Sequence, residues 1–400
     1  MSQDPRDPRL QPFHHLQTPY KTFTDNNNTT QRIQTDILIP KTIPHPTQPK
    51  PLPIIIYFHG GGLICGSALY LDWFPRYLLE LAQSTPAVLL APNYRLLPEA
   101  TIHAVFEDVL DFWAWVHSSP AVSAALATVP SPPTASGRLA IDRARVLVAG
   151  GSAGGYLSLC LALRFPEQIR GAVVGYPAFL GLTSSFLEVS AVAEGAAAVA
   201  VSSSPSAGGD DDGRKGKSGP SNGEGVPPDA NNSPAETDDE LRKMHHLLNE
   251  TLALAAQHRS PVRTFTDLPD RLDLMNAAMR TGRIAEMFAR GVDDDDDDDD
   301  DDDPAHDPER SLRYPMERLD EPVKIPRGGI AILHGREDEV VSVEDSVRFV
   351  GKAKMVLRAE DAGRVAVTVR EGGHGFDSAV GLGDGWLWES LRGVVGGWLE

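Results

Sequence analysis

The chain has 400 residues, 41% hydrophobic and 23% charged, a composition typical of a globular protein with one large domain or two smaller ones. A formal net charge of −19 predicts an acidic surface and argues against nucleic acid as a partner. Only two cysteines occur, which excludes a disulfide framework and favours a reducing compartment, so we expect the protein to be cytoplasmic.

The first fifty residues are polar and rich in proline, with two short apolar segments. We expect edge strands at 20–23 and 33–39, and we expect residues 1–50 as a whole to contribute to a cap. The first fifteen residues lack the apolar core of a signal peptide. No stretch approaches the roughly 18 consecutive apolar residues of a transmembrane helix, so no membrane span is expected.

Short apolar runs recur through residues 51–182 and 326–400 and predict one core domain. Runs of this length that are rich in Val, Ile and Leu are typical of strands buried on both faces. Helical patterns separate most of them, which predicts a mostly parallel sheet with helices on both faces. The expected strands are 53–58, 87–94, 145–150, 171–178, 328–335 and 364–372, and the expected helices are 70–83, 104–117, 156–163, 343–354 and 387–399.

Residues 183–325 interrupt this alternation and are predicted to form an insertion. Residues 202–237 are rich in Ser, Gly, Pro and Asp, and residues 292–308 include eleven consecutive aspartates. Both stretches can bury little apolar surface, so we expect disordered linkers there. Between them, residues 239–290 show a helical spacing of Leu, Met and Ala, which predicts a helical cap.

A serine motif lies between a predicted strand and a predicted helix. Gly150, Ser152 and Gly154 fit the pattern G-x-S-x-G, in which small residues permit a tight turn that presents the serine hydroxyl above the sheet. The helix N-terminus behind the turn stabilises negative charge. Ser152 is therefore the predicted nucleophile. The alternative is a phosphate or dinucleotide loop, although no G-x-G-x-x-G or Walker pattern follows.

Residues downstream could complete a proton relay with this serine. His374 lies in a glycine-rich loop directly after the last predicted strand, where it could accept the proton of Ser152. Glu337, Asp338 and Glu339 follow the preceding strand, and a carboxylate there could orient the imidazole. An exposed acidic turn is the alternative. The order serine, acid, histidine is that of the α/β-hydrolase arrangement.

The sequence HGGG follows the first buried strand and predicts an oxyanion hole. Consecutive glycines let backbone N–H groups approach the negative charge that develops on an ester carbonyl. We expect Gly61, Gly62 and Ala153 to supply these N–H groups, and His59 and Gly60 to serve as scaffold residues. A plain loop is the alternative.

Together these motifs resemble the hormone-sensitive-lipase-like branch of the α/β-hydrolases, called α/β-hydrolase fold-3. The matching segments are HGGGLICGS (59–67), NYRLLPEA (93–100), GGSAGG (150–155), HGREDEVV (334–341) and GGHGF (372–376). The resemblance implies an α/β-hydrolase fold and a carboxylesterase that cleaves small to medium esters through an acyl-enzyme, without metal or cofactor. It also implies a triad of Ser152, Asp338 and His374. Asp338 is preferred over Glu337 because the family pattern H-G-x-x-D-x-x-V has its aspartate at this position.

Three features depart from the family. Asn93 stands where the family usually has Asp, Gly151 stands where it often has Asp, and an unusually long gap separates Ser152 from Asp338. Members of the family that resemble this chain and carry acidic low-complexity inserts look like fungal proteins. Some of those proteins act in secondary metabolism, so a similar role for this chain is an expectation by analogy alone.

Two other functions stay open. A serine peptidase of the prolyl-oligopeptidase type shares the serine motif but usually carries an added domain such as a β-propeller, and none is visible here. A non-enzymatic ligand receptor on the same fold, like the plant gibberellin receptors, lacks the catalytic histidine, whereas His374 is present. The sequence predicts neither the acyl and alcohol groups nor the oligomeric state.

Overall fold

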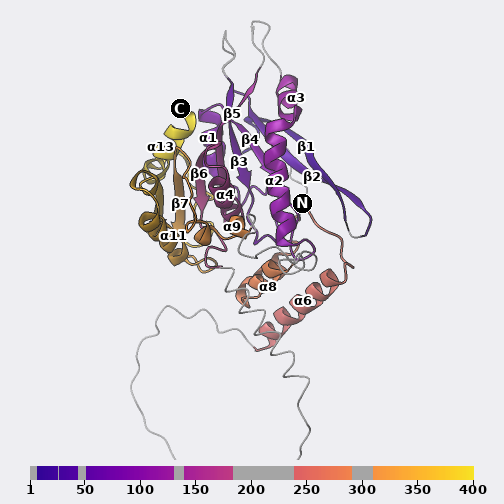
Figure 1. Ribbon diagram of the computed structural model, residues 1–400. Helices are drawn as coiled ribbons and strands as arrows, with labels where there is room; N and C mark the ends of the chain where they lie inside the picture. Colours follow the sequence, from indigo (N-terminus) through magenta and orange to yellow (C-terminus); the bar gives the residue numbers. More distant parts are fainter. Residues whose placement is uncertain (1–6, 26, 44–50, 130–138, 183–237, 291–309) are drawn as a thin grey trace, which may run out of the picture.

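A computed structural model describes residues 7–25, 27–43, 51–129, 139–182, 238–290 and 310–400. The strands in these residues are β1 (Phe13–Thr24), β2 (Thr30–Pro40), β3 (Leu52–Phe58), β4 (Val88–Pro92), β5 (Ile141–Gly151), β6 (Ile169–Gly175), β7 (Ile330–Gly335) and β8 (Val365–Arg370). They form one sheet in the order β1-β2-β4-β3-β5-β6-β7-β8 (Figure 1). Strands β3 to β8 pair in parallel, while β1 and β2 pair antiparallel, which confirms the mostly parallel sheet.

Helices cover both faces of this sheet, so its central strands are apolar at successive positions. In β3, Ile54 and Ile56 contribute to the core on one face and Ile55 to the core on the other, and all three are fully buried. The first core includes α2 (Ile102–Ser118), α4 (Ala153–Arg164) and α11 (Val343–Val356), and the second includes α1 (Arg76–Ser84) and α13 (Gly385–Leu399). This layered arrangement is the α/β-hydrolase fold that the sequence predicts.

Two helices differ from the sequence expectation. The helix expected at 70–83 begins only at Arg76, because Pro75 precedes it and the residue before a proline disfavours helical backbone. Helix α3 (Ala121–Thr128) is present although it was not predicted. It buries only Val122 and Leu126, so its sequence carries no clear apolar stripe.

The N-terminal segment forms an antiparallel hairpin at the edge of the sheet. The register of β1 and β2 runs from Phe13 opposite Pro40 to Thr24 opposite Thr30, and β2 then pairs with β4. The expected edge strands are therefore present and longer than predicted. The described part of residues 1–50 forms strands, whose alternating side chains suit a sheet edge, and its expected contribution to a cap stays a prediction.

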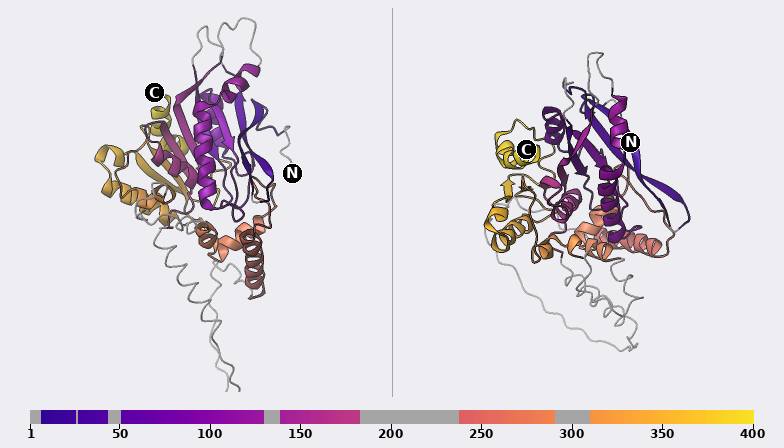
Figure 2. Two further views of the ribbon diagram at one scale, coloured as in Figure 1. Left: turned by 45° about the vertical axis from the view of Figure 1, so that its right-hand side comes forward. Right: turned by 45° about the horizontal axis from the view of Figure 1, so that its top comes forward.

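The helices expected at 239–290 are present as α6 (Asp238–Ala256), α7 (Leu272–Arg280) and α8 (Ile284–Ala289). Helices α6 and α8 lie beyond one end of the sheet in every ribbon view (Figures 1 and 2). The short helices α9 (Arg310–Arg313) and α10 (Pro315–Arg318) lead back to β7, and α12 (Ala359–Ala362) precedes β8. The linkers predicted at 202–237 and 292–308 lie outside the described residues, and the division into core and insertion stays a prediction.

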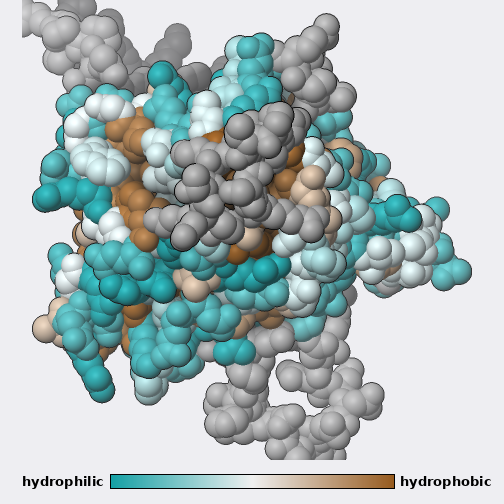
Figure 3. Space-filling view, turned by 90° about the horizontal axis from the view of Figure 1, so that it is seen from above, coloured by the Kyte–Doolittle hydropathy of each residue, from teal (hydrophilic) through white to brown (hydrophobic). Residues whose placement is uncertain are grey.

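Seen from the end opposite α6 and α8, the molecule carries hydrophilic residues over much of its rim (Figure 3). A groove of about 740 Å³ is lined by both basic residues, such as Arg170 and Arg327, and acidic residues, such as Glu167 and Glu360, but by none of the predicted site residues. Among the helices that the structure describes, none combines the length and apolar character required to cross a lipid bilayer.

Candidate active site

The predicted catalytic residues all follow parallel strands of the sheet. Ser152 follows β5, Asp338 follows β7 and His374 follows β8. Because the carboxyl ends of parallel strands meet at one edge, the three residues lie at the same edge of the sheet.

Ser152 occupies a sharp turn between β5 and α4. Its backbone angles, φ 55° and ψ −124°, are uncommon for a residue with a side chain. The N–H of Ser152 donates to the Gly175 carbonyl at 3.0 Å, and its own carbonyl accepts the N–H groups of Tyr156 (3.0 Å) and Ala178 (3.2 Å). These bonds hold the serine in a strained conformation, as found at many functional sites.

Two glycines flank this turn because the end of β3 approaches it closely. A Cβ on Gly154 would lie 2.0 Å from the Phe58 carbonyl oxygen, and one on Gly150 would lie 2.4 Å from the Gly154 carbonyl. Neither position has room for a side chain, so the two glycines of the serine motif have a packing role.

Replacing Gly154 with alanine is expected to lower the free energy of unfolding by about 3 kcal/mol, because the new methyl group collides with backbone that cannot yield easily. Urea unfolding measures the change. The matched control is Gly393→Ala in α13, where an added Cβ meets nothing within 4 Å and should stabilise the helix by about 0.5–1 kcal/mol. Equal unfolding midpoints for Gly154→Ala and the wild type would contradict the close approach.

A buried carboxylate holds the candidate base. Nδ1 of His374 lies 2.9 Å from Oδ2 of Asp338 and 3.1 Å from Oδ1. The Asp338 side chain is fully buried, whereas that of His374 is 26% exposed. The backbone N–H groups of Val340 and Val341 both donate to Asp338 Oδ1 at 2.9 Å. The carboxylate is therefore fixed on one side and directed at the imidazole on the other.

The surroundings of Asp338 keep it ionised. Burial alone would raise the pKa of Asp338, but hydrogen bonds from His334 and His374, together with the positive charge of His374 and the Val341 N–H, hold that pKa well below its usual range. The alternative acid, Glu337, accepts the Gly372 N–H at 2.5 Å instead. Of the three acids that the sequence offers, Asp338 is the one that contacts the imidazole.

The HGGG loop leaves β3 and passes beside Ser152. A Cβ on Gly60 would lie 3.5 Å from the Cβ of Ser152. Gly61 and Gly62 have φ angles of 105° and 63°, in the left-handed region that favours glycine. No described residue accepts a hydrogen bond from the N–H of Gly61, Gly62 or Ala153. The loop therefore approaches Ser152 at Gly60, and three N–H groups of the predicted oxyanion hole have no acceptor in the described part of the chain.

The side chain and backbone of His59 make contacts that hold the HGGG loop in place. Its ring stacks on Tyr94 with centroids 4.3 Å apart and planes at 8°. Its Nδ1 lies 2.7 Å from the Gly60 carbonyl oxygen, and the Tyr94 hydroxyl donates to the His59 carbonyl at 2.7 Å. Burial lowers the pKa of His59 to about 4, so the imidazole is neutral at physiological pH. These contacts agree with the scaffold role predicted for it.

Asn93, which departs from the family pattern, still supplies an acceptor. Its Oδ1 accepts the N–H of Ala68 at 2.8 Å, and its backbone carbonyl accepts the Tyr20 hydroxyl at 2.8 Å. An amide oxygen is sufficient for the first bond, so the position needs no charge.

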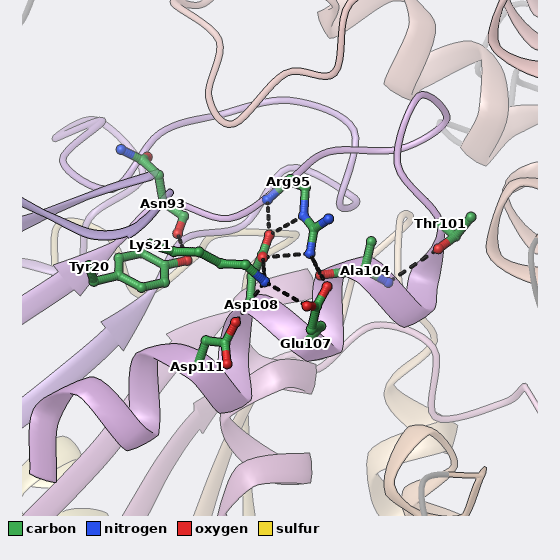
Figure 4. Close-up of polar contacts among 9 residues, drawn as sticks. All are labelled: Tyr20, Lys21, Asn93, Arg95, Thr101, Ala104, Glu107, Asp108 and Asp111. Atoms are coloured by element: carbon green, nitrogen blue, oxygen red, sulfur yellow. Dashed lines mark hydrogen bonds and ion pairs between the residues drawn. The ribbon is translucent and has the colours of Figure 1, made fainter. Parts of the chain in front are cut away.

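An ionic network anchors the loop that follows Asn93 (Figure 4). Arg95 donates to the fully buried Asp108 from its backbone N–H, its Nε and its Nη2, over 2.7 to 2.9 Å. Lys21 of β1 reaches the same carboxylate at 2.9 Å, and Glu107 pairs with both cations. The network joins the N-terminal hairpin, helix α2 and the loop on which the inserted helices rest.

The inserted segment contacts this loop and the HGGG loop directly. Gly66 and Thr266 form a reciprocal pair, because the Gly66 N–H donates to Thr266 Oγ1 (2.8 Å) and the Thr266 N–H donates to the Gly66 carbonyl (2.9 Å). Arg271 pairs with Glu99 at 2.9 Å, and both side chains are less than 10% exposed. Met275 of α7 is the nearest neighbour of Gly62, with Cγ 3.1 Å from a Cβ placed there. Sequence spacing predicted these helices but none of these contacts.

Sequence analysis missed Tyr176, which packs between the turn that carries Ser152 and the ring of His374. Its ring centroid is 4.7 Å from that of His374, with planes at 62°. A Cβ on Gly151 would lie 2.7 Å from the Tyr176 hydroxyl, and the adjacent Gly175 carbonyl accepts the Ser152 N–H. The serine turn and the histidine loop therefore pack against one tyrosine. Glycine at position 151, where the family often has Asp, was the available signal, since it leaves room for this hydroxyl.

The arrangement suits nucleophilic attack on a carbonyl carbon. It combines a serine in a strained turn, a histidine held by an ionised carboxylate, and free backbone N–H groups. Within the described part of the chain, no group of three or more His, Cys, Asp or Glu side chains is placed to hold a metal ion.

The chain is similar to a family model and to several known proteins. A family model described as an alpha/beta hydrolase fold matches residues 55–203. Probable carboxylesterase M8 from Phoma sp. is 26% identical over 340 residues, covering 84% of this chain and 82% of the relative. Tuliposide A-converting enzyme b1, amyloplastic, from Tulipa gesneriana is 34% identical over 149 residues, and the match spans only 36% of either protein. A solved esterase from Pyrobaculum calidifontis is 16% identical, with a TM-score of 0.47 and coverage of 98% of this chain and 87% of that chain.

Proposed function

Because this chain belongs to the α/β-hydrolase fold family, we propose that it is a serine carboxylesterase that cleaves small to medium esters through an acyl-enzyme. One observation carries the proposal. The N–H groups of Gly61, Gly62 and Ala153 have no acceptor among the described residues. Ala153 directly follows the strained Ser152, and a Cβ on Gly60, next to Gly61, would lie 3.5 Å from the Cβ of Ser152. Such donors have their greatest value when negative charge develops on an attacked carbonyl oxygen.

In the proposed reaction, the hydroxyl of Ser152 attacks the ester carbonyl carbon while His374 takes its proton. Asp338 holds Nδ1 of the imidazole and stabilises the imidazolium that forms. The three N–H groups bind the oxyanion of the tetrahedral intermediate, and His374 then protonates the departing alcohol. A water molecule, activated by the same histidine, hydrolyses the acyl-enzyme and restores Ser152.

A panel of p-nitrophenyl esters and a fluorophosphonate probe test this function. The expected result is hydrolysis of short and medium esters together with covalent labelling at Ser152. A folded protein that neither hydrolyses the esters nor reacts with the probe would overturn the proposal and favour a ligand receptor.

The inserted helices are proposed to cover the site and to limit the acyl group. Support comes from Met275, whose Sδ lies 3.6 Å from the Cys65 thiol and whose side chain contacts Gly62. An acyl chain bound with its carbonyl at the oxyanion hole would meet this thioether first.

Replacing Met275 with alanine is therefore expected to raise the ratio of kcat/KM for an octanoate ester to that for an acetate ester by about 5- to 10-fold, since removed methylene groups free space for the acyl chain. The matched control is Met355→Ala on α11, where the side chain is 80% exposed and the ratio should stay constant. An unchanged ratio in a folded Met275→Ala protein would exclude α7 from the acyl site.

A small-molecule ester is the proposed substrate, and a place in secondary metabolism rests on the family resemblance alone. Cys65 and Cys160 are both free and buried, which supports the proposed cytoplasmic location.

A further inference from the structure

We propose that His334 is a positioning residue that fixes Asp338, the acid of the triad, in the orientation that holds His374. The proposal rests on the proposed function, because it concerns the acid of that reaction. His334 touches no reacting atom in the mechanism above. The argument depends on which atoms face its two ring nitrogens and on how those atoms are connected to Asp338.

His334 belongs to β7, and its side chain is completely buried. A polar side chain buried this far is unfavourable unless its polar atoms are hydrogen-bonded. Both nitrogens of the ring have partners, because Nδ1 lies 2.8 Å from Oγ of Ser346 in α11 and Nε2 lies 3.0 Å from the Val341 carbonyl oxygen. The ring therefore links the end of β7 to helix α11 and to the loop that carries Asp338.

The ring of His334 reaches the triad acid in two ways. Directly, its Nε2 lies 3.4 Å from Oδ2 of Asp338, the same oxygen that lies 2.9 Å from Nδ1 of His374. Indirectly, the backbone of Val341 connects the two side chains, because its carbonyl faces Nε2 and its N–H donates to Asp338 Oδ1 at 2.9 Å. Each carboxylate oxygen is therefore tied to His334, one by a direct contact and the other through Val341.

The partners of the ring determine which nitrogen carries the proton. Two acceptors face Nε2, the Val341 carbonyl oxygen and the Asp338 carboxylate, so Nε2 is the nitrogen that donates. The Ser346 hydroxyl group faces Nδ1 and can donate to it, so the ring is fully hydrogen-bonded while neutral. A neutral donor suits this place because a second positive charge beside Asp338 would compete with the imidazolium that forms on His374.

A fixed carboxylate matters because proton transfer depends on the orientation of His374. A small misplacement of a catalytic group lowers the rate of the chemical step. The backbone N–H groups of Val340 and Val341 fix Oδ1 of Asp338. Among the described residues, the nitrogens that contact Oδ2 belong to His374 and His334. Without His334, Oδ2 would depend on the very base that it positions.

The first test compares His334→Met with His334→Gln, two replacements of similar length. The glutamine amide can present an N–H near the position of Nε2, whereas methionine has no donor. We expect His334→Met to lower kcat for p-nitrophenyl butyrate about 10- to 30-fold with KM unchanged, and to slow fluorophosphonate labelling of Ser152 by the same factor. His334→Gln should keep kcat within about 3-fold of the wild type.

Phe349→Leu is the control for lost stability, because Phe349 is fully buried on the same helix as Ser346. It should lower the melting temperature while kcat stays within about 2-fold of the wild type. A folded His334→Met protein with the kcat of an active wild type would overturn the positioning role alone. Equal losses of kcat in His334→Met and His334→Gln would also overturn it, since the donor would then make no difference.

Ser346 provides a second arm that leaves the imidazole in place. Ser346→Ala should lower kcat about 3- to 5-fold, because the ring can then carry its proton on Nδ1 and present a lone pair to Asp338. In the His334→Met background it should have no further effect on kcat, since the hydroxyl group acts through the ring. An unchanged kcat in Ser346→Ala, or an equal loss in both backgrounds, would overturn the proposal. A wild type that hydrolyses no ester and takes no probe would overturn the proposed function, and this proposal with it.

Discussion

Replacing Ser152 with alanine is expected to lower kcat for p-nitrophenyl butyrate by at least about 10⁴-fold, because the acyl-enzyme of the proposed reaction forms on the Ser152 hydroxyl group. The strained turn and its backbone bonds do not involve the hydroxyl group, so the variant should fold as the wild type does. Initial rates across the ester panel measure the loss, and circular dichroism checks the fold.

Ser158 gives a matched control on the same helix. It is fully buried, and its hydroxyl group has no hydrogen-bond partner among the described residues. Ser158→Ala should therefore leave kcat and KM unchanged. If Ser152→Ala kept more than a few per cent of the wild-type rate while remaining folded, Ser152 would not be the nucleophile.

Replacing Asp338 with asparagine is expected to lower kcat by up to roughly 10⁴-fold. The amide has the volume of the carboxylate, but it lacks the charge that stabilises the imidazolium, and it can present an N–H to Nδ1 and so favour the wrong tautomer of His374. Steady-state rates for the ester panel measure the change.

Glu337→Gln is the comparison that isolates the acid. Glu337 accepts the Gly372 N–H, and a glutamine oxygen can keep that bond, so we expect a loss below about 5-fold. If Glu337→Gln lost more activity than Asp338→Asn, the acid of the triad would be Glu337, and the direct contact of Asp338 with His374 would have another purpose.

The parts of the site that the sequence predicted depend on local backbone requirements. A serine flanked by glycines between a strand and a helix is typical of the tight turn that presents a nucleophilic serine. In this structure the turn requires glycine at position 154, because a Cβ there would collide with the Phe58 carbonyl oxygen. The HGGG loop is similar, since the φ angles of Gly61 and Gly62 are restricted for other residues. Such requirements restrict which residue types can occupy these positions, so they can be recognised from the sequence.

The parts that the sequence did not predict depend on contacts between distant segments. Tyr176 and His374 meet across about half the chain, and nothing in the short strand before Tyr176 marks it as a neighbour of His374. The contact of Met275 with Gly62 is of the same kind, because helical spacing shows that a helix forms and not what lies beneath it. The strands of the N-terminal hairpin are longer than the sequence predicts for the same reason, since the partner strand of β2, β4 (Val88–Pro92), lies far along the chain.

The docking of the inserted helices has a consequence for how such a protein can diverge. The reciprocal Gly66–Thr266 bonds and the Arg271–Glu99 pair place Met275 by contacts made within the folded chain, rather than by the lengths of the segments that connect the insertion to β6 and β7. For a flexible linker, which the sequence predicts at 202–237 and 292–308, doubling the length adds only about 0.6 kcal/mol of closure entropy. Natural selection can therefore lengthen, shorten or recode those connections almost freely while it preserves a handful of docking residues. In an enzyme built this way, an insertion can change quickly in sequence and still be important for which substrate the enzyme accepts.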